Sequence, residues 1–153
     1  WAAMLMALPL AGLLIRTFII MHDCAHGSFL PWSKANDTIG FITGVISFTP
    51  FQAWRREHAL HHASSGDLDH RGVGDIVTLT VSEYQARTRF GRFKYWLYRH
   101  PVVLFGIGPL HMMILQRFKW RETLATGRKQ LWNVWMTNIA LLGVIFILGW
   151  TLG

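Results

Sequence analysis

Cysteine and charged side chains are scarce in this sequence, and each scarcity excludes a class of protein. Cys24 is the only cysteine in the 153 residues, so there is no intrachain disulfide and no thiolate cluster for an iron–sulfur centre or a structural zinc ion. Charged residues make up 15% of the chain, against about 25% in ordinary soluble domains. Hydrophobic residues make up 52%. This composition predicts an integral membrane protein.

Acidic residues are also few, 8 against 15 basic ones, which gives a net charge of +7. A basic balance can indicate a nucleic-acid partner. Here, however, the basic residues lie beside apolar segments rather than in a separate polar domain. We therefore expect anionic lipid headgroups as the partner, and no nucleic acid.

Apolar segments of membrane length lie near both ends of the sequence. Residues 1–21 contain Arg16 as their only charge and reach the roughly 20 residues that cross a bilayer, without the basic start and cleavage site of a signal peptide. Residues 131–153 predict a second transmembrane helix, and 101–116 are interpreted as a third. The positive-inside rule argues against that third crossing. A crossing at 101–116 would place the basic loop 117–130 on the face of the membrane opposite to residues 52–100, whereas the rule favours both in the cytoplasm.

Between these segments lie a short apolar stretch and a polar region. Residues 39–51 are too few to cross a bilayer and contain Gly40, Gly44 and Pro50, which predicts an interfacial or re-entrant segment. Residues 52–100 are polar and are expected in the cytoplasm as helices and loops. The predicted fold is one all-α integral membrane domain, a bundle of transmembrane helices, which we interpret as truncated at both ends.

Two clusters of histidine are the strongest chemical signal. In "HDCAH", His22 and His26 stand four residues apart, and in "HALHH", His61 and His62 follow His58 by three and four residues. In a helix these spacings put the imidazoles of each cluster on one face. Imidazole is a ligand for Zn, Cu, Fe and Ni. Since catalytic zinc takes three protein ligands and structural zinc four, five histidines fit two metal ions better than one.

Other polar side chains stand close to these clusters. A ligating histidine usually donates its second N–H to a carboxylate or a carbonyl, so Asp23 is a candidate to orient a ligand, with an ordinary exposed carboxylate as the alternative. Cys24 falls on a different helical face and is interpreted as a small packing residue. Asp67 and Asp69 could also orient histidines, but in a glycine-rich loop they are better interpreted as turn residues.

Both clusters resemble the histidine boxes of the membrane fatty acid desaturases, the first in "HDCAHGSF" and the second in "WRREHALHH". Beyond the boxes, similarity to the bacterial branch related to acyl-lipid omega-6 (delta-12) desaturases extends over "SSGDLDHRGVGDIVTLTVSEYQA" and "LYRHPVVLFGIGPL". Two boxes in this order are a specific signal. The family has a third box, and no histidine follows His111 here. The resemblance therefore implies a fragment that is inactive alone.

The resemblance implies an oxidoreductase that introduces a cis double bond into an acyl chain. In this family two iron ions and O2 remove two hydrogens from adjacent carbons, with electrons from a donor such as ferredoxin or cytochrome b5. The implied iron ligands are His22, His26, His58, His61 and His62. We expect the protein in the bacterial inner membrane, with both boxes facing the cytoplasm.

Two other functions stay open at this point. Related histidine-box oxygenases hydroxylate alkanes or oxygenate carotenes, and "HDCAHG" is also similar to the first box of carotene ketolases. A non-enzymatic membrane subunit could instead bind b-type haem through paired histidines on separate helices. That site needs single histidines facing each other deep in a bundle, whereas these are clustered at the end of an apolar segment.

Overall fold

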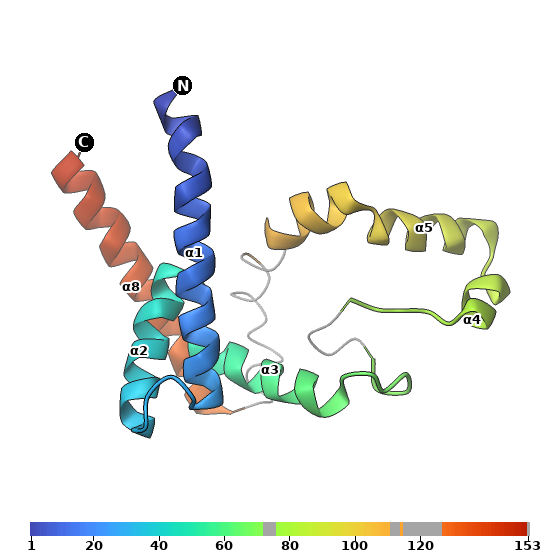
Figure 1. Ribbon diagram of the computed structural model, residues 1–153, viewed down its shortest axis with the longest axis horizontal. Coiled ribbons are helices and arrows are strands. Elements are labelled where there is room, and N and C mark those ends of the chain that lie inside the picture. The colour runs from blue at the N-terminus through green and yellow to red at the C-terminus, as the bar shows by residue number, and fades with distance from the viewer. Residues whose placement is uncertain (72–75, 111–113, 115–126, 153) are drawn as a thin grey trace. The chain divides into compact units, whose positions relative to one another are not determined.

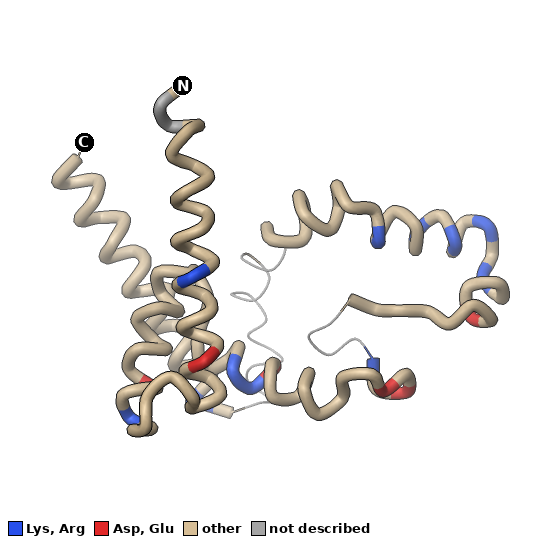
Figure 2. Tube along the Cα trace, in the orientation of Figure 1, with Lys and Arg blue, Asp and Glu red and all other residues tan. Residues whose placement is uncertain are grey.

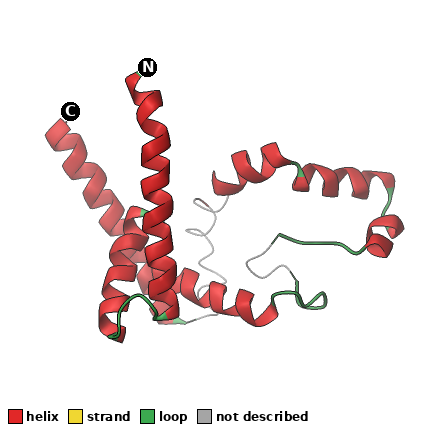
Figure 3. Ribbon diagram, viewed as in Figure 1, coloured by secondary structure: helices red, strands yellow, loops and turns green. Residues whose placement is uncertain are grey.

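The computed structural model describes residues 1–71, 76–110, 114 and 127–152 (Figure 1). Within these ranges helices are the only regular secondary structure (Figure 3). The predicted all-α class is therefore confirmed for the described part of the chain.

The chain divides into two compact units. The first comprises Trp1–Arg56 and Lys119–Gly153, and the second comprises Glu57–Phe118. Helix α3 (Phe51–Ser64) begins in the first unit and continues without a break into the second.

In the first unit, α1 (Ala2–His26) and α8 (Arg128–Leu152) are the two long helices. Met4–His26 and Arg128–Leu152 are long and apolar enough to cross a membrane. Twenty-five residues at about 1.5 Å each extend about 37 Å, which exceeds a hydrocarbon core of about 30 Å. Their side chains are mostly exposed among the described residues. Both correspond to predicted spans.

The end of α1 is defined by a glycine. Gly27 adopts φ 70°, in the left-handed region, and its N–H donates to the carbonyl of Cys24 while that of Ser28 donates to Asp23. This is a Schellman motif, which needs a residue without a Cβ at the left-handed position. Because α1 ends there rather than at residue 21, His22 and His26 belong to its last two turns.

Helix α2 (Ser33–Ile46) packs against α1 and α8. It starts six residues before the predicted segment 39–51, and the chain then turns at 47–50 before α3 begins. Fourteen residues extend about 21 Å, too short for a bilayer core of about 30 Å. The re-entrant assignment stays a prediction, which this length supports.

The glycines of α2 have a packing role that the sequence did not indicate. A Cβ at Gly40 would overlap the aromatic ring of Phe51, and one at Gly44 would lie 2.7 Å from the carbonyl oxygen of Thr49. Phe51 is fully buried, together with Met21 and Cys24 of α1. The packing interpretation of Cys24 agrees with this position.

The second unit contains the rest of α3, an extended segment 76–80, α4 (Val81–Ala86), α5 (Arg89–Arg99) and a π-helix, η1 (Val103–Ile107). The predicted crossing 101–116 lies in part outside the described residues, so its topology stays a prediction.

A short polar network stabilises the start of α4. Thr80 and Glu83 form a capping box, in which each side chain bonds the other residue's backbone N–H. The guanidinium of Arg71 binds both carboxylate oxygens of Glu83, at 2.8 and 2.9 Å, and donates to the carbonyl of Thr78 at 2.7 Å. These bonds lower the pKa of Glu83 to about 2, the Arg71 pair being the largest cause.

Candidate metal centre

The first histidine pair lies on one face of the last two turns of α1. The ring centroids of His22 and His26 are 4.6 Å apart, as expected for residues one turn apart in a helix. His22 Nδ1 lies 3.3 Å from a carboxylate oxygen of Asp23, slightly longer than the usual 2.7–3.2 Å range. Asp23 therefore stands where it can orient His22, through a weak contact.

The second cluster lies on α3. His58 Nε2 and His62 Nε2 are 3.0 Å apart, and their ring centroids are separated by 4.5 Å. Both are ring nitrogens, so without an ion one ring must be protonated at Nε2 and donate to the other. The stacked ring of His61 has its centroid 6.1 Å from that of His58.

Contacts inside the first unit determine how α3 starts beside α1. The ring of Trp54 packs against Phe18, with centroids 5.3 Å apart, and against His22, at 5.9 Å. The side chain of Asn133 on α8 accepts the backbone N–H of Gln52 at 3.0 Å. It thereby satisfies one of the N–H groups that a helix leaves without a partner in its first turn.

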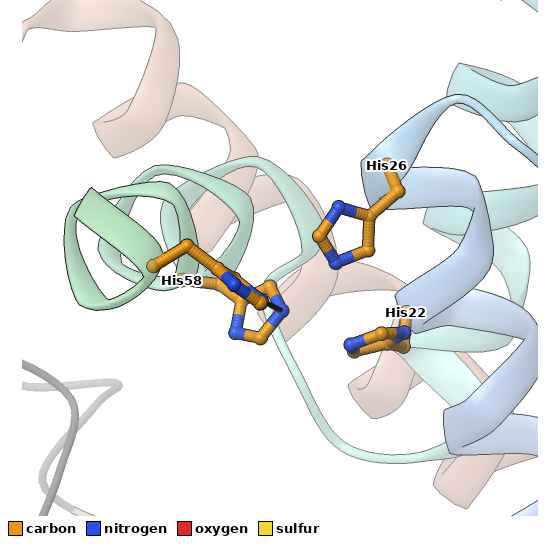
Figure 4. A group of neighbouring side chains, drawn as sticks. His22, His26 and His58 are labelled. Carbon is orange, nitrogen blue, oxygen red and sulfur yellow. Dashed lines mark hydrogen bonds between the residues drawn. The ribbon is translucent and has the colours of Figure 1, made fainter. Parts of the chain in front are cut away.

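The continuity of α3 extends this placement to its histidines. His58 and His62 follow Trp54 by four and eight residues, so they share its helical face, one and two turns further on. Trp54 is the residue of this face that contacts His22 within the first unit. Figure 4 shows the rings of His22 and His26 extending from α1 toward His58 on α3.

Four of the five predicted ligands are brought together in this way. One nitrogen from each of His22, His26, His58 and His62 lies within 4.8 Å of every other. We call these residues the four-histidine group. His22 and His58 are half-buried, whereas His26 and His62 are exposed. The group can therefore be reached from outside the protein.

The spacing of the group suits metal binding. With metal–nitrogen bonds of about 2.1 Å, nitrogens at right angles are about 3.0 Å apart and opposite ones about 4.2 Å. The distance between His58 and His62 matches the first value. The full spread of 4.8 Å is slightly larger than one ion requires, so the group fits one ion after small ring rotations, or a pair of ions. Its donors are of the type that Fe, Zn and Cu accept.

His61 lies outside the four-histidine group but has an unusual environment. Its Nδ1 is buried, and no hydrogen-bond partner for it occurs among the described residues. Leaving a buried polar group unpaired costs about 1–3 kcal/mol, and a ligating nitrogen avoids this cost. The buried Nδ1 of His61 thus suits a metal ligand, although His61 is not one of the four-histidine group.

The acidic residues of the loop after α3 have a different role. Asp67 accepts the backbone N–H of Asp69 at 2.9 Å and contacts His70 Nδ1 at 2.8 Å. The hydrogen bond to His70, followed by the one from the Asp69 backbone, lowers the pKa of Asp67. Asp67 is therefore a turn residue, as predicted, and partners a solvent-exposed histidine.

Sequence reasoning missed Asp37, which helps to hold α3. Arg55 donates to a carboxylate oxygen of Asp37 at 2.8 Å, and Gln52 Nε2 lies 3.4 Å from the same oxygen. No pattern in the sequence links residues this far apart. Only the position of Arg55 next to a histidine box could have indicated a structural role.

Comparison with known proteins identifies the family. The family model described as "Fatty acid desaturase" matches residues 1–153. A protein named fatty acid desaturase from Bacillus subtilis (strain 168) is 41% identical over 145 residues, which is 92% of this chain. The sn-1 acyl-lipid omega-3 desaturase (ferredoxin) of Nostoc sp. (strain 36) is 28% identical over 86% of the chain. The chloroplastic omega-6 fatty acid desaturase of Arabidopsis thaliana is 26% identical over 88% of it.

These matches cover only part of each relative. The chain spans 40% of the Bacillus protein, 36% of the Nostoc protein and 28% of the Arabidopsis protein. No solved structure matches the chain significantly. The family model nevertheless covers every residue, and a relative well above 30% identity covers nearly all of the chain. The chain belongs to the fatty acid desaturase family.

Proposed function

We propose that this chain is part of a membrane oxidoreductase that introduces a cis double bond into the acyl chain of a lipid at the expense of O2. The observation that carries the proposal is the four-histidine group at the end of an apolar helix of membrane length. An acyl chain dissolves in the bilayer, whereas protons and an electron donor arrive from water. A site at the end of such a helix has access to both.

The proposed ligands are the five histidines of the two boxes, and the proposed metal is a pair of iron ions. Four are supported by their mutual spacing and His61 by a buried nitrogen that has no hydrogen-bond partner in the part of the chain that the structure describes. When bound, iron would supply the activation of O2 needed to remove hydrogen from an unactivated methylene, which no side-chain acid or base can do near neutral pH. The chain's own residues hold, orient and shield the ions.

Two neighbours of His22 would orient and shield it. A hydrogen bond donated by His22 Nδ1 to Asp23 would orient the ring so that Nε2 can bind metal. Trp54 packs against the His22 ring and against Phe18, so one side of the site is apolar. Such a wall excludes water from the lipid-facing side.

The family and the fold support proposals for the substrate, the electron donor and the location. The name of the Nostoc relative specifies an acyl-lipid substrate and ferredoxin. We extend both to this protein, with cytochrome b5 as the other possible donor. The two long apolar helices support an inner-membrane location, and we propose that both boxes face the cytoplasm, where such donors are found.

Expression of the full-length protein in a host lacking the product fatty acids tests this function. We expect new monoenes or dienes in the wild type, and none in His58→Ala. The matched control is His70→Ala, which removes an exposed histidine paired with Asp67. Iron content should fall in His58→Ala alone.

The products distinguish the remaining alternatives. Alcohols or ketones in place of new double bonds would show a histidine-box oxygenase instead. A strong Soret band in the purified protein would show a haem subunit. Desaturation that survives in His58→Ala would refute the assignment of the site.

A further inference from the structure

Helix α5 (Arg89–Arg99) has one face that the protein itself covers. The hydroxyl of Tyr95 accepts the backbone N–H of Leu79 at 3.1 Å, and that of Tyr98 accepts the backbone N–H of Val77 at 3.3 Å. Tyr95 also packs against Tyr84 of α4, with ring centroids 5.9 Å apart. Both tyrosines thus hold the segment 76–80 against one side of α5, and the protein covers this side in part, because Tyr95 is half-buried while Tyr98 stays 40% exposed.

The other side of α5 carries a stripe of large apolar side chains. At 100° per residue these side chains span about 120° of the helix circumference. Each of them is exposed, by between 44% and 65%. The members of this apolar stripe are Phe90, Phe93, Trp96 and Leu97. Such a contiguous aromatic surface is unusual on a protein that faces only water.

Basic residues flank the stripe on both edges. By helical position Arg92 and Arg99 lie along one edge and Lys94 along the other, while Arg89, the first residue of the helix, falls within the arc of the stripe. The guanidinium of Arg92 donates to the carbonyls of Arg87 and Gln85. No acidic residue occurs between positions 86 and 100. Figure 2 shows the basic residues of α5 and of the turn before it. Lys94 Nζ lies over the Phe90 ring, 4.7 Å from its centre, so its ammonium makes a cation–π contact with the first residue of the stripe.

The chain after α5 carries further exposed apolar side chains within the same unit. The π-helix η1 contacts α5. Val102 and Phe105 are exposed by 70% and 81%. A helix with an apolar stripe, basic edges and an apolar continuation has the composition of one that lies in the plane of a membrane surface.

We propose that α5 lies in the interface of an anionic bilayer, with the apolar stripe among the acyl chains and its flanking basic residues against phosphate headgroups. This inference is independent of the metal and of the reaction. An acidic protein is the other partner that positive charge could attract, but charge pairing with a soluble protein does not require four exposed apolar side chains. The stripe and the basic edges together favour lipid.

Lipid-borne quenchers test this placement in the full-length protein reconstituted in vesicles. Phe93→Cys carries an environment-sensitive fluorophore in the stripe, and Gln85→Cys, exposed on α4, is the matched control. Cys24 is fully buried and does not compete for the fluorophore. Any accessible cysteine of the full-length protein outside residues 1–153 is replaced by serine. We expect several-fold stronger quenching at position 93 than at 85 by spin-labelled lipid, and the reverse order with aqueous iodide.

The headgroup contribution is measured separately. Quenching at position 93 should increase when phosphatidylglycerol replaces phosphatidylcholine, and the increase should diminish in Lys94→Gln/Arg99→Gln and at high salt. Equal quenching at positions 93 and 85, or no response to lipid charge, would overturn the proposal. So would protection from iodide that requires an added acidic electron-donor protein, because the surface would then bind protein rather than lipid.

Discussion

Arg55 Nη1 donates to Asp37 Oδ1 at 2.8 Å and so connects α3 to α2. The two side chains are 39% and 45% exposed, and an ion pair this exposed contributes only about 0–1 kcal/mol after solvent screening. Its importance is positional. It fixes the first turns of the helix that carries His58 and His62, and the hydrogen bond from Gln52 to Asn133 fixes the same turns from α8.

Asp37→Asn should weaken desaturation with little loss of stability. Removing the charge loosens the start of α3, so the histidines should hold iron less firmly. We expect an activity loss below the roughly 10- to 100-fold that follows loss of a direct partner of a ligand. Product yield and iron content of the full-length protein measure the effect. Asp69→Asn, in the loop after α3, should match the wild type, and unchanged iron content in Asp37→Asn would contradict the positional role.

His61→Ala should abolish activity and leave membrane insertion intact. The substitution removes a proposed ligand whose Nδ1 is buried without a partner among the described residues, and it alters no membrane span. Product analysis measures the activity and membrane fractionation measures the insertion, with His70→Ala as the control. If His61 were only a packing residue, the variant would keep its iron and most of its products.

Gly40→Ala should destabilise the first unit by about 1–3 kcal/mol, because the added Cβ overlaps the ring of Phe51. Thermal unfolding in detergent measures this loss. Gly12→Ala is the matched control on α1, where a Cβ would meet nothing within 4 Å, and it should be neutral or slightly stabilising. Equal melting temperatures for the two variants would mean that Phe51 can move away without cost.

The segment around Glu83 should loosen in acid. Its pKa is lowered from 4.5 to about 2, chiefly by Arg71 and then by the backbone and hydroxyl of Thr80. A lowered folded-state pKa stabilises the fold above the unfolded value, and this contribution is lost as the pH falls from about 4.5 toward 2. Hydrogen-exchange protection of residues 76–88, corrected for intrinsic rates, should fall in that window. Glu83→Gln should lack the transition, and a transition that persists there would assign it to another group.

The elements that could be predicted from sequence are those defined by local pattern. The two long apolar helices follow from hydropathy, and the facing of His22 with His26 follows from helical spacing. The predicted start of the middle segment at residue 39 was too late, because the polar residues 33–38 do not resemble the apolar run that they precede. In the structure these residues form the first turns of α2, and Asn36 among them is buried and bonds the backbone of Leu30.

Long-range contacts could not be predicted. The glycines of α2 indicated a break in an apolar segment, whereas they provide space for Phe51. The Arg55 to Asp37 contact joins residues with no shared periodicity. The five proposed ligands were named from spacing and resemblance. That His61 stands apart from the other four depends on ring orientations that spacing does not determine.

The fit of the Phe51 ring against Gly40 also limits how far α3 can move along α2. Sliding α3 along α2 by one residue would move it about 1.5 Å and drive the ring into neighbouring backbone. The ring and Gly40 therefore hold the start of α3 in register by shape, in addition to the polar contacts of Arg55 and Gln52. A larger side chain at position 40 would displace the start of the helix that carries His58 and His62.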